Sequence, residues 1–186
     1  MQEKGGVINA QSEQNQAREE LRTATAMVDQ TDRDLDIAEN ELKTQKLALD
    51  TAKLNLKSAQ QAGDVNRKNQ AERDVNVAEM GVKAADAKCD WLSKKKKMHK
   101  RERDAAEAHV SAADSHVELE KAKLAESKGI KPTQDFSIMN FESESMDKSK
   151  KYSEAKLDAD KIRPDVDDLE RKYKMLQDQY NGAKSH

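Results

Sequence analysis

Residues 21–63 read LRTATAMVDQTDRDLDIAENELKTQKLALDTAKLNLKSAQQAG, and this stretch decides the fold. An aliphatic residue stands at every seventh position, namely at Leu21, Val28, Leu35, Leu42, Leu49 and Leu56. Alanine fills most of the positions three residues further on. A heptad repeat of this length is typical of α-helices that wind around one another. The stretch therefore predicts a coiled coil rather than a globular domain built around a pocket.

The repeat stops at Gly63–Asp64 and then resumes, first at Val75, Val82 and Cys89 and later at Val110, Val117 and Leu124. Glycine favours a helix end and aspartate favours the next helix start. We therefore expect residues 9–128 to form a long antiparallel helical hairpin with its turn near residues 62–65. Such a turn pairs residues whose numbers sum to about 128, which places acidic residues 29–39 opposite basic residues 94–103. An unbroken helix paired with a second copy, a domain-swapped dimer, gives the same pairing.

The remaining segments follow from local composition. Residues 1–8 are polar and glycine-containing, which predicts a flexible N-terminal arm. Residues 129–145 show no helical period, so we expect an irregular apolar connection. This connection either caps the helices or docks a partner through Phe136, Ile138 and Phe141. Residues 146–182 carry a second heptad pattern and predict a third helix, kinked near Pro164 because proline lacks the helical N–H donor.

The composition agrees with this assignment. Charged residues make up 38% of the chain and aromatic residues 3%, which leaves little material for a thick core. The expected fold class is all-α, an elongated antiparallel coiled coil of three long helices completed by a second chain. A homodimer would supply that chain, since a two-helix seam with alanine at its core positions buries little area. No stretch approaches the ~20 apolar residues of a membrane span.

Residues for catalysis are not arranged in any recognisable motif. The four histidines are His99, His109, His116 and His186, and His109 and His116 lie too far apart on one helix to share a metal ion. No glycine-rich phosphate loop, nucleophile elbow or cysteine pair is present. Cys89 occupies a core-type position and is expected to pack as a small apolar residue. The sequence therefore predicts no enzyme, no metal, no cofactor and no small-molecule substrate.

One local signal points to a function, the basic run SKKKKMHKRER over residues 93–103. Four consecutive lysines spread around a helix, so one acidic stripe cannot face them all. Part of the run pairs internally, and the rest forms an outward patch suited to anionic lipid headgroups. Nucleic acid is the less suitable partner, because its readers usually add stacking aromatics and only Trp91 is near. The expected membrane-binding residues are Lys94, Lys95, Lys97, Lys100 and Arg101.

Three long helices, a basic cluster midway along the second and a proline in the third resemble the layout of a BAR domain over residues 8–180. That resemblance implies an antiparallel homodimer at the periphery of a membrane, which binds and shapes or senses anionic lipid through the basic residues named above. The long 129–145 segment departs from the compact second turn of that layout. The alanine-rich hairpin also resembles those of bacterial periplasmic adaptor proteins and coiled-coil envelope lipoproteins. This alternative implies a rigid spacer or protein-docking scaffold that uses the hairpin tip at residues 60–66.

Overall fold

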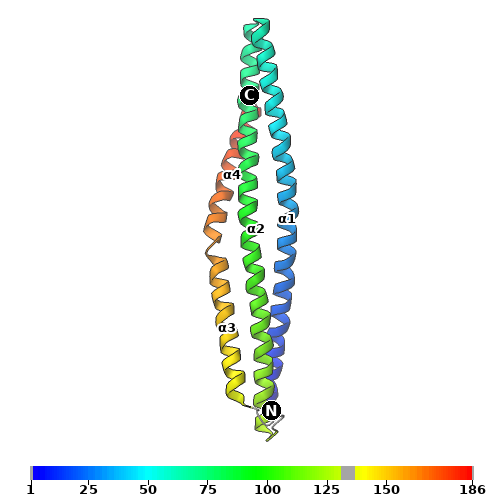
Figure 1. Cartoon of the computed structure of the whole chain (residues 1–186), viewed down its shortest axis with the longest axis vertical. Helices are drawn as coiled ribbons and strands as arrows, with labels where there is room; N and C mark the ends of the chain where they lie inside the picture. The colour runs from blue at the N-terminus through cyan, green and yellow to red at the C-terminus, as the bar shows by residue number, and fades with distance from the viewer. Residues whose placement is uncertain (1, 131–136, 186) are drawn as a thin grey trace. The chain divides into compact units, whose positions relative to one another are not determined.

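A computed structural model describes residues 2–130 and 137–185 of the chain. Its helices are α1 (Gln2–Ala62), α2 (Val65–Ser127), α3 (Ile138–Asp160) and α4 (Arg163–Lys184), and the described residues contain no strand (Figure 1). The predicted all-α class is therefore confirmed. The contribution of a second chain stays a prediction. The chain divides into two compact units, which are described separately below.

The first unit combines Met1–Asp29 with Lys97–Ile162, and the second combines Gln30–Lys96 with Arg163–His186. Each contains an early part of the chain packed on an antiparallel part of α2. In the first unit the Gln14 amide contacts the Asp114 carboxylate at 2.7 Å. In the second unit the Lys96 ammonium lies 2.5 Å from the Asp32 carboxylate. Both pairs have residue numbers that sum to 128, so the predicted register is confirmed inside each unit.

The turn between α1 and α2 has the backbone that its sequence favours. Gly63 has a φ of +71°, a conformation that glycine adopts without a Cβ penalty. Asp64 then caps α2, because its Oδ1 accepts the backbone N–H groups of Asn66 at 3.0 Å and Arg67 at 3.1 Å. At the other end of α2, Gly129 has a φ of +68° and Ile130 N–H donates to the Ala125 carbonyl, which closes a Schellman turn.

Alanine, and not leucine, occupies the most buried row of α1. Ala10, Ala17, Ala38, Ala52 and Ala59 are at most 8% exposed and are spaced by multiples of seven. The leucines at the expected core positions, such as Leu42 and Leu49, are only half-buried. Alanine lets two helix backbones approach closely, so the wider leucines are left at the flanks of the seam. The hairpin is therefore a narrow seam supported on one side by a third helical segment in each unit.

The structure corrects three predicted boundaries. The flexible arm expected at residues 1–8 is wrong, because α1 begins at Gln2. Gly6 packs against the Glu120 side chain and Ala10 is fully buried, so the seam continues through this region. The irregular connection expected at 129–145 is also wrong over its second half, because α3 begins at Ile138. The seven-residue spacing from Ile138 through the buried Ser145 to Tyr152 explains the longer helix.

The third boundary concerns the third helix, which is divided into α3 and α4 by the turn at Lys161–Ile162. The division lies directly before Pro164, near the predicted kink. Pro164 stands in the first turn of α4, where the missing N–H would have no helical partner in any case. The apolar spacing nevertheless continues through the turn, since Ala159 and Val166 are both at most 4% exposed.

Candidate functional site

The predicted basic residues of α2 are largely engaged in contacts within their own units. In the second unit Lys94 lies 2.7 Å from the Asp165 carboxylate of α4, and the Lys95 ammonium stands 5.1 Å from the centroid of the Trp91 ring. In the first unit Arg101 donates to the Asp158 carbonyl at 3.2 Å. Lys97 and Lys100 are exposed and form no ion pair with the described residues. The outward patch is therefore smaller than the sequence indicates.

The predicted partner-docking residues lie at the start of α3. Ile138 and Phe141 occupy its first turn and are half-buried, while Phe136 lies outside the described residues. A half-buried position in a helical seam favours packing over docking. These two residues therefore extend the heptad pattern of α3 in the first unit.

The histidines of the first unit each contact a carboxylate. The Nδ1 atoms of His99, His109 and His116 lie 2.7 to 2.8 Å from carboxylate oxygens of Glu102, Glu20 and Glu13 respectively. The His109 ring also stacks on Tyr152 of α3, with centroids 4.3 Å apart. Across the described residues, no three potential metal ligands gather at one point. The contacts of His109 and His116 join α2 to α1, whereas that of His99 lies within α2.

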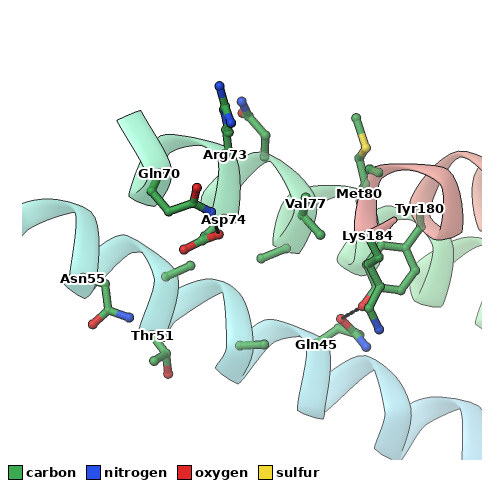
Figure 2. A pocket seen from close by; sticks show the side chains of 15 residues that line it. Gln45, Thr51, Asn55, Gln70, Arg73, Asp74, Val77, Met80, Tyr180 and Lys184 are labelled. Carbon is green, nitrogen blue, oxygen red and sulfur yellow. Dashed lines mark hydrogen bonds between the residues drawn. The ribbon is translucent and has the colours of Figure 1, made fainter. Parts of the chain in front are cut away.

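A groove of about 780 Å³ lies in the second unit, beside the C-terminal end of α4. Figure 2 shows α1 along one side, α2 along the other, and Tyr180 and Lys184 of α4 at one end. Val77 lies between the two long helices, and the Tyr180 hydroxyl contacts Gln45 Oε1 at 3.4 Å. The lining also includes the small residues Ala48, Ala52 and Ala78.

Few of the side chains that line the groove carry charge, although several are polar amides or hydroxyls. Of the fifteen residues that line it, only Arg73, Asp74 and Lys184 are charged, in a chain that is 38% charged. Asp74 accepts a hydrogen bond from Gln70 at 3.0 Å, which partly satisfies its carboxylate. Depletion of charge over a concave surface is typical of the centre of a protein interface. The groove is therefore the best candidate for a binding site in the second unit.

No protein-family model, curated protein or solved structure matches this chain. Function must therefore be argued from its side chains alone. Among the described helices, none combines the length and the apolar character needed to cross a membrane.

The groove was not among the features predicted from the sequence, although the heptad patterns contain an indication of it. The heptad pattern of the third helical segment reaches its last aromatic residue at Tyr180, where the patterns of α1 and α2 continue toward their turn. Ala52 on α1 and Ala78 on α2 belong to those continuing patterns. Small apolar residues that extend past the end of the helix covering them mark an uncovered seam.

Two pKa shifts accompany the α1–α2 contacts of the second unit. Partial burial by itself lowers the pKa of the Lys88 ammonium. Its hydrogen bond to Glu41 at 2.6 Å and the negative charge of Glu41 outweigh that effect, so the pKa of Lys88 is raised. Burial raises the pKa of the Cys89 thiol, with further contributions from the nearby carboxylates Glu39, Asp86 and Asp90. A raised thiol pKa reduces the thiolate fraction, which disfavours a reactive role for Cys89.

Proposed function

We propose that the protein is a non-enzymatic helical docking scaffold, which holds a partner protein in the groove at the α1–α2 hairpin end. The observation that carries the proposal is the groove itself, whose lining next to the end of α4 holds three charged residues among fifteen. A narrow seam with alanine at its core leaves apolar surface open where no third helix covers it.

Photo-crosslinking tests the proposal. Benzoylphenylalanine is placed at Ala48, which is exposed and lines the groove, or at the neighbouring Leu47, which is exposed and lies outside the groove lining. In extracts of the source cells, we expect one dominant adduct from position 48 and none from position 47. The partner is then identified by mass spectrometry, purified and titrated against the wild-type protein and an Ala48→Lys variant. Equal adducts from both positions, or equal affinity for both proteins, contradicts the proposal.

A second candidate is an anionic membrane surface, in keeping with the BAR-like layout, a homodimer and a location at the membrane periphery. It is supported by the exposed side chains of Lys97, Lys100 and Arg101 on α2 of the first unit. It ranks second because Arg101 already donates to a backbone carbonyl and Lys94 is paired with Asp165. Lipid binding of this kind weakens steeply with salt, because it is electrostatic.

Cosedimentation with liposomes tests the second candidate. If these residues bind lipid, more protein should pellet with anionic liposomes than with neutral liposomes at low salt. A Lys97→Glu, Lys100→Glu double variant should lose that difference, while Lys150→Glu, an exposed lysine of α3, should retain it. If anionic and neutral liposomes recover the same amount of wild-type protein, the membrane function is wrong.

A further inference from the structure

The groove continues the surface on which α4 itself packs. Gln45 and Tyr180 line both the groove and a smaller cavity of about 420 Å³ beside α4, which also includes Gly81 and Tyr173. Further along α4, the Tyr173 ring stacks on Trp91 with centroids 5.6 Å apart and an interplanar angle of 11°. The groove between α1 and α2 is therefore filled by α4 along one part of its length and open along the next part.

The register of α4 against α2 indicates which kind of segment would fit the open part of the groove. Tyr173 meets Trp91 of α2 and Tyr180 meets Gly81, so residue numbers rise along α4 while they fall along α2. Beyond Tyr180 the lining of the groove continues with Val77 on α2 and with Thr51 and Asn55 on α1. A helix placed in line with α4 would set its next heptad residue over this position.

The lining also indicates the chemistry of such a helix. Alanine, threonine and valine side chains leave room for a helix that presents medium or large apolar residues, as α4 does with Val166, Tyr173 and Tyr180. Charged residues on the docked face would lie over a mostly uncharged lining and lose hydration without gaining a partner. Only the lining residues Arg73, Asp74 and Lys184 favour charges on the partner.

We propose that the groove takes an amphipathic α-helix of a partner protein, which lies end to end with α4 and repeats apolar or aromatic residues at the spacing of α4. This inference rests on the proposed docking function and names the class of partner. Helices of this type bind through a few anchors spaced three, four and seven residues apart. The continuity of the groove with the packed α4 is the observation that carries the proposal.

The probe for this proposal is a fluorescein-labelled peptide with the sequence of residues 163–184, titrated into the full chain and followed by anisotropy. We expect saturable binding to the wild-type protein. An Ala48→Lys variant should bind at least about tenfold more weakly, a difference of about 1.4 kcal/mol. The matched Leu47→Lys variant should bind within about twofold of wild type, because Leu47 is 67% exposed and outside the groove lining. Thermal melts must first establish that both variants fold.

Trp91 serves as an internal reporter, because it is the single tryptophan and lies under α4. Binding in the open length of the groove should leave its emission unchanged. A shift in Trp91 emission on binding means that the peptide has displaced α4, and this overturns the proposal. The absence of saturable binding, or equal binding by the wild-type and Ala48→Lys proteins, also overturns it.

The two proposals fail in distinguishable ways. If photo-crosslinking at Ala48 captures a specific partner but the α4 peptide does not bind, the docking function stands and the α4-like chemistry of the partner is wrong. If the peptide binds at Ala48 but no specific partner is captured, the docking function is wrong.

Discussion

The ring of Tyr180 on α4 lies 3.0 Å from the point where a Cβ on Gly81 of α2 would stand. Gln45 Oε1, which contacts the Tyr180 hydroxyl at 3.4 Å, is 2.5 Å from the same point. The flexible Gln45 side chain could move away from a Cβ at this point, but the Tyr180 ring would have to shift by a few tenths of an ångström, so glycine at position 81 suits the packing of α4 on the α1–α2 pair. Gly81 is consequently a packing residue inside a helix.

A Gly81→Ala variant tests this contact. Alanine at a helix interior is worth about 1 kcal/mol over glycine. Overpacking lowers stability by about 1 to 3 kcal/mol, so the cost of moving the Tyr180 ring should exceed the gain in helix propensity. We expect a lower free energy of unfolding and a change in Trp91 emission, because α4 stacks Tyr173 on that ring. Gly182→Ala is the matched control, since a Cβ there has no neighbour within 4 Å. If Gly81→Ala is as stable as Gly182→Ala, α4 does not pack on Gly81.

The contact between His109 and Tyr152 predicts a similar effect in the first unit. The two rings are stacked, and His109 also contacts Glu20 of α1, so one side chain joins three helical segments. We expect Tyr152→Ala to lower the free energy of unfolding by about 1 to 2 kcal/mol, as a half-buried aromatic is lost. Tyr152→Phe keeps the ring and should cost less than about 0.5 kcal/mol. Urea unfolding followed by circular dichroism measures both, and equal losses would argue against a role for the stack.

How much of this architecture is predictable from sequence depends on what fixes each part. The turn at Gly63–Asp64 and the pairing register were predictable, because glycine, an N-cap aspartate and a seven-residue period act locally or along one helix. The early starts of α1 and α3 were not, because they depend on packing of Ala10 and Ser145 against distant residues. Glycine at positions 5 and 6 and serine near 145 weaken the local helix signal, and tertiary contacts outweigh it.

The candidate site was less predictable than the fold for the same reason. Counting charges over residues 94–103 identified a basic excess, but it could not show that Lys94 reaches Asp165 of α4 or that Arg101 reaches the Asp158 carbonyl. Those partners are more than fifty residues away in the chain. The groove at Ala48 and Val77 likewise lies beside the last turn of α4, whose position no local pattern of α1 or α2 encodes.

The Lys88–Glu41 pair predicts a specific dependence of stability on pH. Folding raises the pKa of Lys88 above the usual 10.5 of a lysine, so the stabilisation by this pair is fully present below pH 10.5. As the pH rises through the raised pKa, the folded ammonium loses its proton and the stabilisation is lost. We expect Glu41→Gln to lower the free energy of unfolding at pH 7 by about 0.5 to 1 kcal/mol, a modest value because Glu41 is half-exposed.

The difference between the wild-type and Glu41→Gln proteins isolates this pair, since other lysines and tyrosines also titrate at alkaline pH. Denaturant unfolding between pH 7 and pH 11 should show the difference shrinking toward zero in the alkaline range. Glu72→Gln removes an exposed pair with Lys68 at 3.6 Å and should change stability by less than about 0.5 kcal/mol. A difference that stays constant up to pH 11 would contradict the assignment.

Cys89 should react slowly with alkylating agents in the folded protein. Burial is the largest cause of its raised thiol pKa, and Glu39 of α1 is the next, so both depend on the packed hairpin. Because the thiolate is the reactive form, we expect alkylation by iodoacetamide at pH 8 to be at least about tenfold slower in the native chain than in urea. A pH profile of the rate should give a higher apparent pKa for the thiol in the folded protein than in the unfolded chain. Equal rates in the two states would mean that Cys89 is not packed in the seam between α1 and α2, and would remove the packing role that its heptad position predicts.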